Sequence, residues 1–168
     1  MLSNKLEKAL NKQINAEFYS AYFYLSMSSF LNEINLTGFS NWMRVQFEEE
    51  QFHAMKIYDY VLERGGKVKL DAIEKPPYKW KDVLDVFKDV LKHEQHVTKL
   101  INDLTDLAIQ EKDHATVNFL QWFIDEQVEE EANVSELLAQ LEMIEGKGSG
   151  LFMLDREAKQ RKFIAPTE

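Results

Sequence analysis

Residues 65–81, GGKVKLDAIEKPPYKWK, decide the fold of this chain of 168 residues. The segment has Gly65-Gly66 at its start and Pro76-Pro77 near its end, and both pairs are unfavourable inside a helix. Its 17 residues, at roughly 3.3 Å each, reach about 55 Å when extended. A connection of this length can run along a whole bundle of helices, so the two helices that it joins are predicted to be parallel.

Apolar residues recur at helical spacing on both sides of this segment, over roughly 5–33, 38–64, 82–110 and 113–145. The short links at 32–37 and 111–113 predict antiparallel neighbours. The expected fold is therefore all-α, a four-helix bundle with one long crossover between helices 2 and 3. A short fifth helix is expected over about 151–162, after three closely spaced glycines. We expect a single domain over 1–168, with the bundle at about 5–145.

The composition is that of a globular protein, with 45% hydrophobic and 29% charged residues. A net charge of −9 disfavours nucleic-acid binding and suits a cationic cargo. No apolar run approaches the roughly 20 residues of a membrane span, so no membrane association is expected. The chain has no cysteine, which rules out disulfides and thiolate ligands. Together with an N-terminus that lacks a signal-peptide pattern, this predicts a cytoplasmic protein.

Polar residues on the apolar stripes of the four long segments repeat with a single offset. Three pairs are each separated by 77 positions: Glu17 with Glu94, Glu50 with Gln127, and His53 with Glu130. A charge in the middle of an apolar stripe costs several kcal/mol unless it is paired. A cation between these side chains would remove that cost, so the repeat predicts a metal site to which both halves of the bundle contribute.

The heights of these residues along the helices agree with this prediction. Glu17 and His53 each lie about 18 residues from the midpoint of the first short link, and Glu94 and Glu130 are placed in the same way about the second. Antiparallel pairing then brings all of them into one layer. Hard carboxylates with an imidazole one turn away favour iron or manganese. Helix geometry alone does not choose between Glu130 and Glu131, because both lie about 50° from the centre of their stripe.

Other polar residues near this layer have simpler interpretations. His93 and His96 flank Glu94 but point away from the stripe, so both are expected at the surface. His114 has no counterpart in the 77-residue repeat. Tyr24 lies on the same face as Glu17, and its hydroxyl group is expected near the site.

Several stretches of the chain resemble prokaryotic non-haem ferritins. They are residues 15–22 (NAEFYSAY), 48–54 (EEEQFHA), 123–131 (FIDEQVEEE), 73–77 (IEKPP) and 152–155 (FMLD). The resemblance covers almost the whole chain and implies a ferritin-like fold.

The resemblance also implies a ferroxidase centre with two irons per subunit. The implied ligands are Glu17, Glu50, His53, Glu94 and Glu130, with Glu50 bridging the irons and Gln127 and Tyr24 beside them. Glu49, Glu126 and Glu129 match a third iron site of bacterial members. Their positions at the flank of the stripes equally suit plain surface charge.

The implied function is iron storage, in which Fe(II) is oxidised by O₂ or H₂O₂ and Fe(III) is kept as a mineral core. By resemblance the chain forms a homo-oligomer, a hollow shell of 24 subunits, with the fifth helix near the fourfold axes. Haem is not expected, because Gln51 stands where bacterioferritins have a haem-binding methionine. Two alternatives remain at this level: a diiron oxidase that stores no iron, and a structural helical bundle without metal.

Overall fold

The computed structural model describes residues 2–165, so the predicted domain limits, 1 and 168, lie outside the described residues. The helices are α1 (Asn4–Glu33), α2 (Thr37–Glu63), α3 (Val83–Gln110), α4 (His114–Met143) and α5 (Gly148–Ala158). The four long helices begin and end within two residues of the predicted limits, and residues 2–165 contain no strand. None of these helices combines the length and the apolar character needed to cross a membrane.

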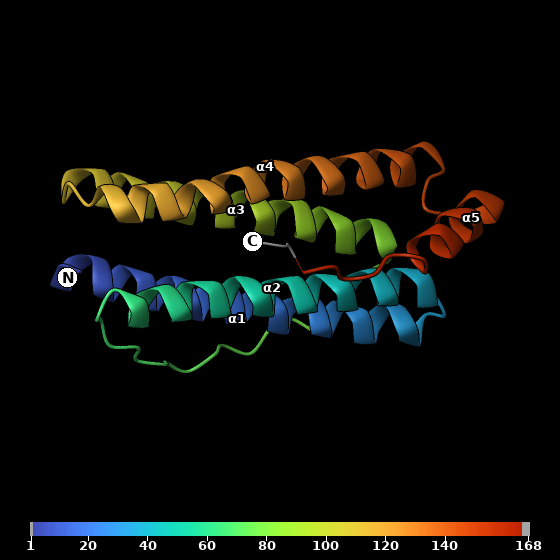
Figure 1. Cartoon of the computed structure of the whole chain (residues 1–168). Coiled ribbons are helices and arrows are strands. Elements are labelled where there is room, and N and C mark those ends of the chain that lie inside the picture. Colours follow the sequence, from blue (N-terminus) through green and yellow to red (C-terminus); the bar gives the residue numbers. More distant parts are fainter. Residues whose placement is uncertain (1, 166–168) are drawn as a thin grey trace.

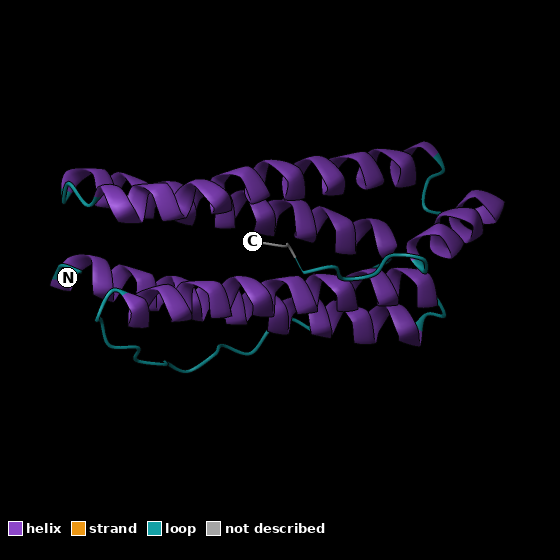
Figure 2. Ribbon diagram, in the orientation of Figure 1, coloured by secondary structure: helices purple, strands orange, loops and turns teal. Residues whose placement is uncertain are grey.

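The helices form two antiparallel pairs, α1 with α2 and α3 with α4 (Figure 1). The long connection returns from the end of α2 to the start of α3, so these two helices run in the same direction. Figure 2 shows that this connection contains neither helix nor strand. The predicted all-α bundle with one crossover is confirmed.

Side chains on one face of α1 hold the crossover in place. The Asn11 side chain donates to the Lys67 carbonyl at 2.9 Å and accepts from the Lys69 backbone N–H at 2.6 Å. Farther along α1, Asn15 and Ser26 donate to carbonyls of the same connection. Because these hydrogen bonds satisfy backbone groups of an extended segment, the crossover lies along α1 without forming a sheet.

Three long helices begin with a capping side chain close in sequence. Ser3, Asp82 and Asp113 each accept a backbone N–H three residues later, at 3.0–3.2 Å. Helix α2 has no such local cap. Instead, the Phe39 N–H donates to Oδ1 of Asp155 at 2.9 Å, so α5 caps the start of α2.

Helix α5 spans Gly148–Ala158, so it begins and ends earlier than the predicted 151–162. Gly148 has a φ of +68°, which allows the sharp turn out of α4. Beyond Ala158 the chain leaves the helix, where the Asn41 side chain of α2 donates to the Ala158 and Arg161 carbonyls. Tertiary hydrogen bonds therefore end α5 earlier than its apolar pattern predicted.

The predicted apolar face of α5 is only partly covered by the chain itself. Leu151 and Leu154 are partly buried against the core, whereas Phe152 is 63% exposed. A helix this short depends on such packing for its stability. The rest of this face is available to another surface.

The core consists of two hydrophobic clusters on either side of a polar layer. One cluster includes Leu10, Ile57, Ile101 and Leu120, and the other includes Met27, Met43, Phe87 and Leu141. Along every long helix the buried polar residues of the 77-residue repeat lie between these two sets. The fold thus places charged side chains in the middle of the bundle, far from both ends.

Candidate metal centre

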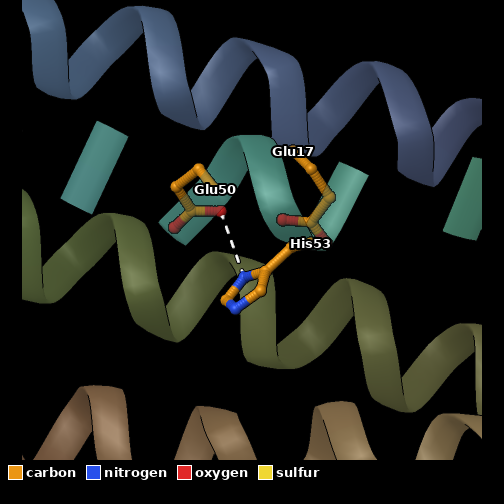
Figure 3. Close-up of side chains that lie close together, drawn as sticks. All are labelled: Glu17, Glu50 and His53. Atoms are coloured by element: carbon orange, nitrogen blue, oxygen red, sulfur yellow. Dashed lines mark ion pairs between the residues drawn. The ribbon is translucent and has the colours of Figure 1, made fainter. Parts of the chain in front are cut away.

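Glu17 of α1 meets Glu50 and His53 of α2 in this polar layer (Figure 3). One ligand atom from each lies within 4.8 Å of the others, and the three residues are at most 4% exposed. No other three His, Asp or Glu side chains within residues 2–165 meet at this distance. The short link between α1 and α2 brings these residues to one level, as the sequence predicted.

The second half of the bundle contributes buried polar side chains from α3 and α4. Glu94 accepts hydrogen bonds from the Tyr24 hydroxyl group and from Nε2 of Gln127, the latter at 3.1 Å. Glu130 is also buried and faces the interior. Glu131, the alternative that helix geometry left open, accepts instead from Thr98 and is only partly buried.

Two glutamines near the site were missed by the sequence analysis. Gln13 donates to Oε1 of Glu17 at 2.8 Å, and Gln46 donates to Oε2 of Glu130 at 3.0 Å. Both are buried, and each lies one helical turn before a predicted ligand on the same helix. The 77-residue repeat could not find them, because the equivalent positions hold Val90 and Phe123. The sequence signal that could have identified both glutamines is their position on the buried stripe of their helix.

Burial controls the protonation of this layer. It raises the pKa of Glu50 well above the ordinary value, with the negative charge of Glu17 next in importance. Burial, followed by the charge of Glu130, raises the pKa of Glu94 to about 8. For His53 burial lowers the pKa, so its ring is neutral and its 3.5 Å contact with Glu50 is not an ion pair. A neutral imidazole is the form that binds metals.

The donor set fits a divalent cation. Oε2 of Glu17 and Oε2 of Glu50 are buried and have no hydrogen-bond partner among the described residues. Buried oxygens without partners are rare in proteins and usually have a functional reason. Carboxylates with an imidazole and no thiolate suit iron or manganese, and the unpartnered oxygens supply free lone pairs.

The residues matched to a third iron site do not form a comparable group in the structure. Glu49 and Glu126 are partly buried, and Glu129 is exposed. Burial raises the pKa of Glu49 to about 7, although the guanidinium of Arg161 opposes this shift. Nη2 of Arg161 donates to Oε2 of Glu49 at 2.8 Å, a contact that the sequence did not indicate.

The expectation that His93 lies at the surface is wrong. Its Nε2 is 2.8 Å from Oγ of Ser20, and its ring centroid is 4.8 Å from that of Phe23. Burial lowers the pKa of His93 to about 4. A single-helix projection placed it outside the stripe of α3 but could not show that α1 packs against that flank. His96 is exposed, as expected, and His114 is exposed as well.

An all-α bundle with one crossover and inward-facing Glu and His side chains has the architecture of the carboxylate-bridged metal proteins of the ferritin-like type. Residues 7–144 match the family model described as a ferritin-like domain. The chain belongs to the ferritin family, and iron storage is the general function of that family.

Known relatives agree over nearly the whole chain. It is 42% identical to a bacterial non-heme ferritin of Bacteroides fragilis over 161 residues, covering 96% of this chain and 100% of the relative. It is 41% identical to one of Staphylococcus saprophyticus over 163 residues, covering 97% and 98%.

Solved structures agree as well. An open pore ferritin from the archaeon Archaeoglobus fulgidus is 53% identical, with a TM-score of 0.95 and coverage of 96% and 100%. A closed form of that ferritin, engineered by site-directed mutagenesis, is also 53% identical, with a TM-score of 0.96 and coverage of 98% and 100%. At this identity and coverage the likeness extends to the whole domain, α5 included.

Proposed function

We propose that this chain is a ferroxidase that oxidises Fe(II) with O₂ or H₂O₂ and stores Fe(III) as a mineral inside a hollow homo-oligomeric shell. The observation that carries the proposal is the pair of buried carboxylate oxygens, on Glu17 and Glu50, that have no hydrogen-bond partner among the described residues. They lie beside a neutral imidazole, and burial alone gives such oxygens no stabilisation. In this proposal iron is the substrate of the site.

Two Fe(II) ions balance the charge of the layer. Its four carboxylates, when ionised, carry four negative charges, and His53 is neutral. We assign Glu17, Glu50 and His53 to one iron, with Glu50 shared. The second iron is completed by Glu94 and Glu130, which approach from α3 and α4.

Neighbouring amides and a phenol orient these ligands. The donors are Gln13 to Glu17, Gln46 to Glu130, and Tyr24 and Gln127 to Glu94. Glu17 and Glu130 are each held at one oxygen, whereas both oxygens of Glu94 are held. Carboxylates stabilise Fe(III) over Fe(II), so each iron can give one electron to the oxidant. Position 127 holds the amide of Gln127 and not a carboxylate. Because an amide is the weaker ligand for iron, Fe(III) is held less tightly and can move on from the centre.

Storage requires assembly, and we propose a shell of 24 subunits in the cytoplasm. The solved relatives are ferritins that share α5. In this chain Phe152 and Met153 of α5 are 63% and 69% exposed, a surface that suits a contact between subunits. The third iron site at Glu49, Glu126 and Glu129 belongs to the same proposal, and no haem is expected.

Glu50→Ala tests the centre, with Glu48→Ala as control because Glu48 is exposed on the same helix. Aerobic addition of two Fe(II) per chain should give rapid oxidation in the wild type and the control, and slow oxidation in Glu50→Ala. Size-exclusion chromatography with iron detection, after aerobic loading with Fe(II) well in excess of two per chain, then reports storage. Oxidation by Glu50→Ala at the wild-type rate would contradict the site. Rapid oxidation without retained iron in a large particle would instead indicate a diiron oxidase.

A further inference from the structure

A basic tail follows α5 and lies back along α2 toward the middle of the bundle (Figure 1). Residues 159–162 read KQRK. Asn41 of α2 anchors this tail, because its Nδ2 donates to the Lys159 carbonyl at 3.4 Å and to the Arg161 carbonyl at 3.0 Å. Farther along the tail, the Phe163 ring lies 6.1 Å from that of Phe52. The tail is thus docked on both sides of Arg161.

Arg161 reaches from this tail to the edge of the candidate metal centre. Its Nη2 donates to Oε2 of Glu49 at 2.8 Å, and the two side chains are 23% and 21% exposed. The guanidinium carbon lies 4.4 Å from the Trp42 ring, in cation–π range. Nη1 is buried and has no partner among the described residues, so the guanidinium is not fully satisfied.

The surroundings of Glu49 are strongly acidic. It precedes Glu50 in sequence, and the negative charges of Glu126, Glu129 and Glu130 act on it. Arg161 is the positive charge that acts on Glu49, and Lys56 acts on Glu126. A metal ion at Glu49 would lie within a few ångströms of the guanidinium, a distance at which two like charges repel each other. Arg161 and a metal ion therefore compete for the same carboxylate.

We propose that Arg161 is a built-in counterion that holds the Glu49 carboxylate until a metal ion displaces it. The C-terminal tail then sets the affinity of the third iron site. This inference rests on the proposed ferroxidase function and deepens it, because it separates the paired irons from a third iron that must first release the tail. The buried, unsatisfied Nη1 lowers the cost of that release.

Anaerobic calorimetric titration of the assembled apoprotein with Fe(II) tests the proposal. Arg161→Gln removes the counterion, and Lys162→Gln removes an equal charge from the exposed neighbouring residue. Two tight binding events should be unchanged in all proteins. The third, weakest event should tighten by about tenfold in Arg161→Gln, as expected for loss of a partly buried ion pair, and by less than about twofold in Lys162→Gln.

A second variant leaves the arginine in place and loosens its anchor. Asn41→Ala removes the donor to the tail carbonyls and should also tighten the third event. In the wild type, Fe(II) at the third site should increase hydrogen exchange over residues 159–165. Equal third-site affinities in wild type and Arg161→Gln, or an equal gain in Lys162→Gln, would overturn the tail proposal. Absence of any Fe(II) binding by the wild type would overturn the metal centre itself, a different result.

Discussion

Gly38 of α2 is where local propensity and tertiary packing disagree most clearly. Alanine is favoured over glycine in helices by at most about 1 kcal/mol, so Gly38→Ala, in the first turn of α2, looks stabilising from sequence. In the structure, a Cβ at this position would lie 1.6 Å from the backbone carbonyl oxygen of Asp155 in α5. No rotamer relieves a clash between two backbones, so α5 must move.

The size of the effect follows from the contacts that α5 would lose. Moving it breaks the hydrogen bond from the Phe39 N–H to Asp155, a helix cap of about 1 kcal/mol. Disturbed packing around buried Ala158 adds roughly 1–3 kcal/mol. After the propensity gain is subtracted, we expect a net loss of about 2 kcal/mol. The tail follows α5, so the contact between Arg161 and Glu49 should weaken as well.

Denaturant unfolding of the apoprotein at fixed protomer concentration measures this loss, and hydrogen exchange of α5 locates it. Asp155→Ala should lose only the cap, about 1 kcal/mol. Ser149→Ala, at an exposed position of α5, serves as the neutral control. A Gly38→Ala protein at least as stable as the wild type, with unchanged protection of α5, would refute this reasoning.

Three further predictions concern charge, metal and the crossover. The pKa of Glu94 is raised from 4.5 to about 8, so between these pH values the folded apoprotein binds more protons than the unfolded chain. The stability of the apoprotein therefore falls as the pH rises from 4.5 to about 8, and Glu94→Gln should make this fall smaller. Anaerobic Fe(II) at about 100 times its dissociation constant should stabilise the wild type by about 2.7 kcal/mol per site, and Glu50→Ala by less, in thermal unfolding. Asn11→Ala removes the hydrogen bonds to Lys67 and Lys69, which should cost about 1 kcal/mol and speed hydrogen exchange in the crossover.

Matched variants at exposed positions control these measurements. Asp106→Asn, on the same helix as Glu94, should leave the pH dependence unchanged, and an equal flattening there would count against the role of Glu94. Full Fe(II) stabilisation of Glu50→Ala would remove Glu50 from the ligands. Asn102→Ala should not alter exchange in the crossover. Unaltered exchange in Asn11→Ala would show that the crossover is held elsewhere.

The main features of the bundle could be predicted because their causes are local. Helical periodicity is a property of neighbouring residues, and the segment 65–81 is long enough to allow parallel helices on either side of it. His93 shows the limit of this approach. Its position on α3 was projected correctly, but whether a flank is exposed depends on which helix packs there, and Ser20 and Phe23 of α1 cover it.

The sequence by itself determined the four long helices, the crossover and the level at which the acids of the 77-residue repeat meet. These follow from spacing along one chain, which the backbone geometry converts directly into position. Only the tertiary structure decided that Gln13 and Gln46 hold the ligands, that Asp155 caps α2, and that Arg161 reaches Glu49. Each of these hydrogen bonds depends on the direction in which a side chain points. The bonds that join different segments also depend on how those segments pack together. Many polar residues of the sequence could in principle form such hydrogen bonds. Only the packing of the helices decides which of them come within reach of each other.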